Sequence, residues 1–301
     1  MAAGELVLVT GAGGVGRAIV EELRSGGLPV RVMVRRDDAR AAGFRSLGAE
    51  VVVGDLTRPE TVATALEGAG RMYFAMPVSR DHLLAATVVA DVAREYGHLG
   101  ALVGMSQMTV SQMTAVSTAE SRQQRLHWLA ERVFDWSGLP VVHIRPTSFL
   151  DNPLFTVLAA RTIRERGAIE LPFGSGRTSP IAAADVARTV AAVLRDPPPH
   201  IGHVYELTGP RTVDMTEMAG EFSRALGRPV TYTDVPFEQW RAEVLAKAGL
   251  PEHVEEHIAT MARLHHENRY DRSCDDVQRL TGTPAGTVEE FVAARRDFYL
   301  G

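Results

Sequence analysis

The chain has 301 residues, 45% of them hydrophobic, and a formal net charge of −5. A chain of this length and composition can bury a large core in one globular unit or in two closely packed lobes. Its arginines are scattered among aspartates and glutamates without a sustained basic stripe, so we expect a small-molecule partner and no nucleic-acid surface. Cys274 is the only cysteine, which excludes an intrachain disulfide and a multi-cysteine zinc site and fits a reducing compartment, expected to be the cytoplasm.

No segment has the pattern of a secretory signal or of a membrane span. The N-terminal region passes from Met1 directly into the apolar run 5–9, without a basic region, a long apolar core or a cleavage site. The longest apolar window, around 83–93, contains Asp91 and is too short to cross a bilayer. Neither export nor membrane insertion is therefore expected.

Short Val-rich runs alternate with amphipathic segments of helical length through the first half of the chain. This alternation predicts an α/β fold with a Rossmann-type, doubly wound parallel sheet, whose right-handed crossovers cover both faces. Ligands bind at the carboxyl ends of the strands in such sheets, so functional residues are expected in the loops after the strands. The predicted strands are 6–9, 30–34, 50–53, 72–74, 101–104 and 141–144, and the predicted helices are 15–23, 59–66, 82–94 and 124–136.

The strict alternation ends after Arg145-Pro146, and a mixed, mostly helical region follows. We interpret residues 1–150, with 178–209 returning to them, as the parallel-sheet domain, and 151–177 with 210–301 as a smaller substrate-binding lobe. In this half, helices are predicted at 154–166, 183–195, 216–226 and 237–247, strands at 203–207 and 230–233, and turns at 281–282 and 284–286.

The first predicted strand ends in a glycine-rich turn, Gly-Ala-Gly-Gly-Val-Gly at 11–16, and passes straight into a helix. This run matches G-x-G-x-x-G, which provides a tight turn, close backbone approach to a pyrophosphate and close packing of helix on strand. A flexible strand-to-helix turn is the alternative, but the first strand-turn-helix unit of the chain favours a dinucleotide site, with phosphates at the helix N-terminus. The domain 1–150 is therefore expected to bind NAD(P), and the expected contacts are Gly11, Gly13, Gly14, Val15 and Gly16.

Two arginines, Arg35 and Arg36, follow the second predicted strand, where an NAD enzyme usually has an acidic residue on the ribose hydroxyls. Arginine can make bidentate contacts with a 2′-phosphate, so NADPH is the expected cofactor in preference to NADH. The alternative is a solvated basic loop in which Asp37 and Asp38 neutralise both arginines.

The strand ends also place the two rings of the expected cofactor. Asp55, after the third strand, is expected to meet the adenine, although it could instead cap the next helix, and Thr57 competes for that cap. The nicotinamide should face the loops after strands four to six. We therefore expect Ala75, Met76 and Pro77 beside the cofactor, and Met105, Ser106 and Gln107 beside the substrate.

These features resemble the NmrA-like family of atypical short-chain dehydrogenases and reductases, which includes quinone reductases and redox-sensing proteins. Further matches, in order along nearly the whole chain, are 53–57, Glu131 with 137–140, 144–146 with Phe149 and Asn152, 179–181 with 185–187, and 207–210. The resemblance implies that Phe149 packs beside the nicotinamide and that Asn152 hydrogen-bonds near it, although a lone Phe after a strand is more often a core residue. The glycine turn departs from the family spacing G-x-x-G-x-x-G by being one residue shorter, which bears on the phosphate contacts.

The resemblance also locates the catalytic helix. Typical short-chain reductases use a Ser, a Tyr and a Lys four residues after the Tyr. Counting back from Glu131 puts His127 at the Lys position and Gln123 at the Tyr position, so the usual proton donor is missing. His127 could donate a proton or hydrogen-bond the nicotinamide ribose. Ser106 could donate to a carbonyl oxygen, or could be a turn or helix-cap residue.

The missing Tyr restricts the acceptor. Hydride transfer to a quinone gives a hydroquinone anion, whose conjugate acid has a pKa of about 10. A ketone gives a far more basic alkoxide, which needs a general acid positioned beside it. We therefore expect an NADPH-dependent reductase of a quinone or a conjugated or aromatic ketone. A redox sensor that binds NADP(H) and acts through a protein partner is the alternative, and an isomerase or lyase with structural NADP ranks below both. The sequence leaves open whether the protein is a monomer or a homodimer.

No metal site is expected. His265 and His266 are adjacent, so they do not share a helix face, and a solvated helix face is the preferred interpretation. Phe237, Trp240 and Tyr270 could line the second lobe or belong to its core.

Overall fold

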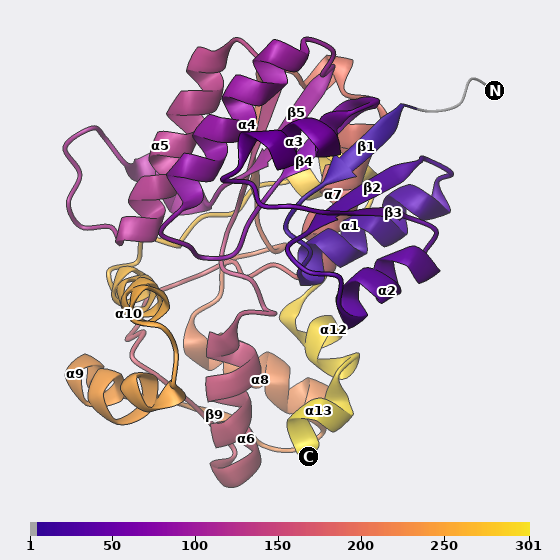
Figure 1. Cartoon of the computed structure of the whole chain (residues 1–301). Coiled ribbons are helices and arrows are strands. Elements are labelled where there is room, and N and C mark those ends of the chain that lie inside the picture. Colours follow the sequence, from indigo (N-terminus) through magenta and orange to yellow (C-terminus); the bar gives the residue numbers. More distant parts are fainter. Residues whose placement is uncertain (1–4) are drawn as a thin grey trace. The chain divides into compact units, whose positions relative to one another are not determined.

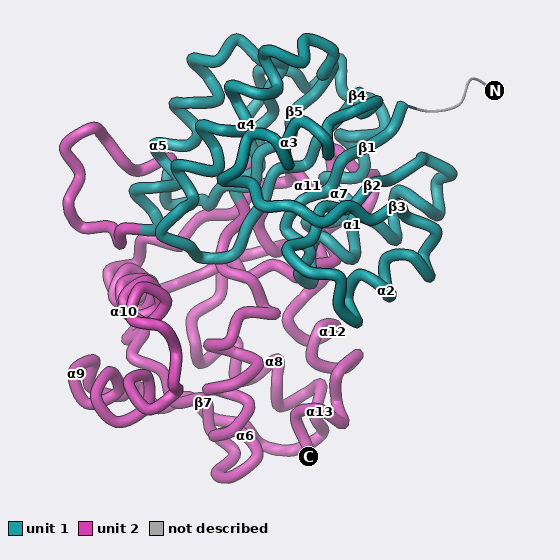
Figure 2. The backbone as a smooth tube through the Cα atoms, in the orientation of Figure 1, with its two compact units in different colours: residues 1–110, 123–145, 186–205 teal, residues 111–122, 146–185, 206–301 magenta. Residues whose placement is uncertain are grey.

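The structure is a computed structural model that describes residues 5–301. The chain divides into two compact units, coloured separately in Figure 2. Unit 1 is formed by the chain up to Val110 with Gln123–Arg145 and Val186–Tyr205, and unit 2 by Ser111–Arg122, Pro146–Asp185 and Glu206–Gly301.

A seven-stranded sheet has the order β3-β2-β1-β4-β5-β6-β8. Figure 1 labels its strands β1 to β5. Neighbouring strands pair in parallel, with Val7 opposite Val30 on one side of β1 and Val9 opposite Tyr73 on the other. The predicted parallel sheet is therefore confirmed, and its strand order reverses between β1 and β4. The strands are β1 (Leu6–Val9), β2 (Val30–Val34), β3 (Glu50–Val53), β4 (Ala69–Phe74), β5 (Ala101–Met105), β6 (Val141–Pro146) and β8 (Val204–Leu207).

Apolar residues hold helices against this sheet. Leu8, Met72 and Leu102 are fully buried and pack in one cluster with Val89 and Phe134, which come from two different helices. Because β1 and β5 are buried on both faces, their sequences are nearly continuous apolar runs, as expected for parallel strands. The helices are α1 (Gly14–Ser25), α2 (Ala39–Ser46), α3 (Pro59–Leu66), α4 (His82–Tyr96), α5 (Arg122–Ser137) and α7 (Ala183–Arg195), with a 3₁₀ turn at Met108–Gln112 and another at Pro198–His200.

Helix α2 is an element that the sequence analysis missed. It buries only Ala41 and Phe44, so its apolar pattern is weak. Its start is set by Asp38, whose carboxylate accepts from the N–H groups of Arg40 and Ala41. Asp38 is thus a helix cap.

Unit 2 is mostly helical. The strand β7 (Ala168–Leu171), which the sequence analysis also missed, pairs in parallel with β9 (Thr231–Asp234). Its helices are α6 (Ala160–Arg166), α8 (Met215–Leu226), α9 (Phe237–Trp240), α10 (Glu252–His266), α11 (Asp276–Thr281), α12 (Val288–Ala293) and α13 (Arg296–Leu300), with π-helical turns at Leu154–Ala159 and Arg241–Leu245 and a 3₁₀ turn at Ala246–Ala248.

The core of unit 2 also corrects one expectation. His265 is 1% exposed and stacks between Phe173 and Tyr270, with ring centroids 4.2 Å and 3.8 Å away. The interpretation of this histidine as part of a solvated helix face was wrong, because two aromatic rings cover it. Among residues 5–301, no helix combines the length and the apolar character needed to span a membrane.

Candidate cofactor and catalytic site

The glycine turn lies where the strand order reverses, between the carboxyl ends of β1 and β4. Gly11 has φ +70°, and a Cβ built on it would lie 2.8 Å from the carbonyl oxygen of Ala75. A Cβ on Gly16 would lie 2.2 Å from the carbonyl oxygen of Gly11. Both positions therefore require glycine, one for its conformation and both for close backbone packing.

Gly13 and Gly14 have the opposite environment. A Cβ on either residue would meet no described atom within 4 Å. Helix α1 begins at Gly14, and its N-cap residue, Gly13, makes no side-chain capping hydrogen bond. The start of α1 is therefore exposed and lacks a side-chain cap, which leaves room for a pyrophosphate at the helix N-terminus. The residues present fit a dinucleotide.

Thr10 joins the glycine turn to the loop after β4, a contact that the sequence analysis did not identify. Its hydroxyl oxygen accepts from the N–H of Ala75 at 3.0 Å and donates to the Ala75 carbonyl at 2.9 Å. The side chain is 1% exposed. This link places the loop 75–77, with Met76 and Pro77, directly beside the turn.

Arg35 and Asp55 form an ion pair across the ends of β2 and β3, with 2.7 Å between Nη2 and Oδ2. The other carboxylate oxygen of Asp55 accepts from the N–H and the hydroxyl of Thr57 at 2.9 and 2.8 Å. These bonds from Thr57, together with Arg35, lower the pKa of Asp55. Neither Asp55 nor Thr57 caps α3, whose N-cap residue is Arg58, so the helix-cap alternative was wrong.

The neighbouring acidic residues pair elsewhere. Asp37 binds Arg45 at 2.7 Å and Asp38 binds Arg40 at 2.8 Å. The alternative in which these two aspartates neutralise the strand-end arginines was therefore wrong. Among the residues described, Arg36 has no ion-pair partner and is exposed, so its charge is available to a ligand.

Ser106 follows β5 and is 6% exposed. Its N–H donates to the carbonyl of Ile144 at 2.8 Å, and its hydroxyl has no hydrogen-bond partner within residues 5–301. Met105 and Gln107, on either side, are half-buried. A buried hydroxyl without a partner is unusual and is consistent with a ligand contact.

His127 and Gln123 lie one turn apart on α5 and touch each other. The distance between Gln123 Nε2 and His127 Nε2 is 3.1 Å, and Gln123 Oε1 accepts from the N–H of Ser79 at 3.1 Å. Gln123 is 4% exposed. The side chain at the position of the usual Tyr is thus a buried bridge between the loop after β4 and the histidine.

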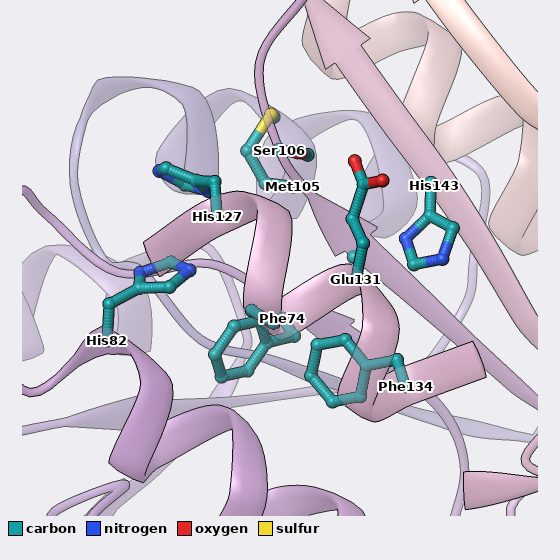
Figure 3. A pocket seen from close by; sticks show the side chains of 10 residues that line it. Phe74, His82, Met105, Ser106, His127, Glu131, Phe134 and His143 are labelled. Atoms are coloured by element: carbon teal, nitrogen blue, oxygen red, sulfur yellow. The ribbon is translucent and has the colours of Figure 1, made fainter. Parts of the chain in front are cut away.

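His82, the first residue of α4, is a neighbour of His127 that the sequence analysis did not identify. The two rings are 4.1 Å apart between centroids and tilted by 52°. Burial lowers the pKa of His82 to about 4, so it is neutral at pH 7. With Ser106, Glu131 and other residues, the two histidines line a cavity of about 10 Å³ (Figure 3), room for about one water molecule.

The orientation of α5 is fixed by buried charge. Glu131, 2% exposed, accepts from Arg145 of β6 at 2.9 and 2.6 Å. Asp135 binds His143 at 2.8 Å, and this hydrogen bond is the main cause of the lowered pKa of Asp135. Two consecutive turns of α5 are therefore fastened to β6, and His127 lies one turn before them.

Phe149 and Asn152 belong to unit 2 and are both half-buried. Phe149 forms an isolated bridge with Ile181, and Asn152 Oδ1 accepts from the N–H of Leu154 at 3.0 Å, at the start of a π-helical turn. Their expected place beside the nicotinamide stays a prediction.

Unit 2 contains a cavity of about 270 Å³ between the segments 158–166 and 235–247. Its lining combines apolar residues such as Leu158 and Trp240 with the ion pair Arg166–Glu170 and with Lys247, the only lysine of the sequence. The expected role of this lobe in substrate binding stays a prediction. Among residues 5–301, no group of three or more His, Cys, Asp or Glu side chains is arranged to hold a metal ion.

Comparison with known proteins places this geometry in a family. The model of the NmrA-like family matches residues 3–292. The chain belongs to the NmrA-like family. An NAD(P)H azoreductase of Xenophilus azovorans is 30% identical over 96% of this chain and 97% of its own length.

Solved structures of the same fold include an enzyme and a regulator. An NADPH-dependent quinone oxidoreductase of Escherichia coli, complexed with NADPH, superposes with a TM-score of 0.83 at 22% identity and covers 96% of this chain and 99% of its own. NmrA, a negative transcriptional regulator in complex with NADP, gives a TM-score of 0.81 at 19% identity, covering 97% and 95%. At these identities the likeness establishes the NmrA-like fold.

Proposed function

We propose that this NmrA-like protein is an NADPH-dependent reductase that transfers hydride to a quinone or to a conjugated or aromatic ketone. The observation that carries the proposal is the open cradle at Gly13 and Gly14, where the uncapped N-terminus of α1 faces space that no described side chain fills. The similarity to an NAD(P)H azoreductase over nearly the whole chain supports it.

The choice of NADPH rests on the end of β2. Arg36 is exposed with no ion-pair partner among the described residues, and Arg35 extends its guanidinium to Asp55. Both guanidinium groups suit a 2′-phosphate, and no unpaired carboxylate follows the strand to repel one. Asp55, held by Arg35 and Thr57, keeps its proposed position toward the adenine.

When bound, the cofactor supplies the hydride. The part of this chain is to orient the acceptor, exclude water and supply hydrogen bonds. The Ser106 hydroxyl is buried and has no partner within the described chain, so we assign it the hydrogen bond to the acceptor oxygen. Met105 and Gln107 flank it and are proposed to contact the acceptor.

The side chains around His127 favour an acceptor whose reduced form does not need a proton donor from the protein. Gln123 replaces the proton-donating Tyr of typical short-chain reductases, and its amide cannot act as a general acid. A quinone fits, because the hydroquinone anion formed on reduction is about as acidic as a phenol, near pKa 10, and takes its proton from water. A simple aliphatic ketone would give a strongly basic alkoxide with no acid to protonate it.

The second candidate function is an NADP(H)-binding regulator that acts through a protein partner. It is favoured by the likeness of the fold to NmrA, a negative transcriptional regulator complexed with NADP. Both functions use the same cofactor cradle, so turnover is what separates them.

The test is the rate of NADPH oxidation with a panel of quinones, aromatic ketones and aliphatic ketones, with NADH in parallel. We expect turnover with menadione or a similar quinone, a clear preference for NADPH and no activity on aliphatic ketones. NADPH binding without turnover on any acceptor would support the regulator, and a preference for NADH would refute the 2′-phosphate assignment.

A further inference from the structure

Gln123 is held between a backbone donor and an imidazole ring. Its Oε1 accepts from the N–H of Ser79 at 3.1 Å, and its Nε2 lies 3.1 Å from His127 Nε2. A backbone N–H can only donate, so the amide oxygen must face Ser79. The amide NH₂ must then face the histidine, and the direction of both hydrogen bonds is fixed by the network.

This direction determines the protonation of the histidine. An amide NH₂ has no acceptor lone pair to offer, so the Nε2 atom of His127 must be the acceptor. The proton of a neutral imidazole is then on Nδ1. An imidazolium ring would turn an N–H at Nε2 toward the NH₂ of Gln123, donor against donor, so this contact opposes protonation.

Three titratable side chains line the same cavity as His127. His82, packed on the ring from α4, is itself neutral at pH 7 because burial lowers its pKa to about 4. The carboxylate of Glu131, which lines the same cavity, is paired with Arg145 at 2.6 Å. The third histidine of the cavity, His143, comes from β6 and is bound by Asp135 at 2.8 Å.

We propose that Gln123 is a positioning residue that keeps His127 as the neutral Nδ1–H tautomer, so that His127 acts as a fixed hydrogen-bond donor and not as an acid. The inference rests on the proposed function for its meaning, because it assigns His127 the ribose hydrogen bond instead of proton transfer. It also explains how glutamine serves at the position of the usual Tyr. The Tyr position holds a group that orients the neighbouring histidine.

The experiment reads the tautomer directly. Full-length protein with ¹⁵N-labelled histidine is examined by long-range ¹H–¹⁵N NMR, and the His127→Asn variant assigns the resonances. We expect the pattern of a neutral Nδ1–H imidazole for His127 at neutral pH. An Nε2–H tautomer, or an imidazolium, at neutral pH would overturn the proposal. The measurement does not depend on enzymatic turnover.

The variant Gln123→Glu reverses the interaction, because a carboxylate accepts where the amide donates. We expect a proton on His127 Nε2 and a titration midpoint raised by about one to three pH units. The matched control is Gln124→Glu, which makes the same substitution at the next residue, whose amide instead donates to Thr109 at 2.9 Å. Equal titration of His127 in wild type and Gln123→Glu would contradict the proposal.

Kinetics separate this inference from the proposed function. If the protein turns over, Gln123→Glu should raise the KM for NADPH more than it lowers kcat, and should add a pH dependence that Gln124→Glu lacks. If no acceptor is reduced, the proposed function fails while the NMR result on His127 still decides the role of Gln123.

Discussion

At the scale of single residues, the two arginines after β2 differ in what surrounds them. Arg35 is paired with Asp55 at 2.7 Å, whereas Arg36 has no ion-pair partner within residues 5–301. A guanidinium that is already paired gives up an interaction to bind phosphate, and an unpaired one does not. Arg36 is therefore expected to make the larger contribution to NADPH selectivity.

Replacement of Arg36 by Ala should weaken NADP⁺ binding by about tenfold to a hundredfold, the effect of one lost charge-assisted hydrogen bond. NAD⁺ binding should stay unchanged, because NAD⁺ lacks the 2′-phosphate. Calorimetric titration of both nucleotides measures this, with Arg40→Ala as control, since Arg40 is occupied by Asp38 at 2.8 Å. Equal losses for NADP⁺ and NAD⁺ would show that Arg36 does not contact the 2′-phosphate.

Local spacing predicted some of these residues and not others. The glycine turn was predictable because its chemistry lies in six consecutive residues. The contact of His82 with His127 was not, since the two residues lie on different helices, 45 positions apart, and only packing brings their ring centroids to 4.1 Å. The only indication of the Thr10 contact in the sequence was its position directly before Gly11, and that indication is weak.

At the scale of elements, α5 carries the candidate catalytic histidine and is fastened to β6 through a buried carboxylate. Glu131 is 2% exposed and receives two hydrogen bonds from Arg145. Removing Arg145 would leave this buried carboxylate only a longer ion pair, with Arg132 at 3.6 Å. The stability of this helix therefore depends on Arg145.

Arg145→Met should lower the free energy of unfolding by about 3 to 5 kcal/mol, as for other buried pairs that lose one partner. The double variant Glu131→Gln with Arg145→Met should recover part of the loss, because the amide carries no charge. Urea unfolding measures both. A loss of less than about 1 kcal/mol in the single variant, typical of a surface pair, would mean that this bridge does not hold α5.

The elements themselves were predictable where their patterns are local. The bounds of β1, β2, β3, α3 and α7 agree with the sequence analysis, since each is an uninterrupted apolar or amphipathic run. Helix α2 was missed because it buries only two residues. Strand β7 was missed because it has only four residues and pairs with a strand that is distant in sequence. Ala168 of β7 lies opposite Thr231 of β9.

Across the whole of residues 5–301, burial markedly lowers the pKa of three histidines. Burial lowers the pKa of His82, His257 and His265 from 6.5 to about 4. In the unfolded chain each binds a proton as the pH falls below about 6.5, whereas in the folded chain it does so only near pH 4. Their contribution to stability is therefore complete above pH 6.5 and is lost progressively toward pH 4.

The free energy of unfolding should accordingly fall between pH 6.5 and 4 by at most about 3 kcal/mol for each histidine. His265→Phe keeps the aromatic stack with Phe173 and Tyr270 and should make this dependence shallower. Replacement of the exposed His98 by Gln is the control and should leave the slope unchanged. Denaturant unfolding across this pH range gives the slopes, and an unchanged slope in His265→Phe would contradict the assignment.

In the proposed function, hydride passes from NADPH at the glycine turn to an organic acceptor beside Ser106. A single-turnover experiment tests it most directly: protein in excess over NADPH is mixed with menadione, and the absorbance of the reduced nicotinamide is followed. We expect NADPH to be consumed only when the acceptor is present, at a rate that saturates with acceptor concentration. Nicotinamide that stays bound and reduced with every quinone and aromatic ketone would contradict it and would support an NADP(H)-binding regulator.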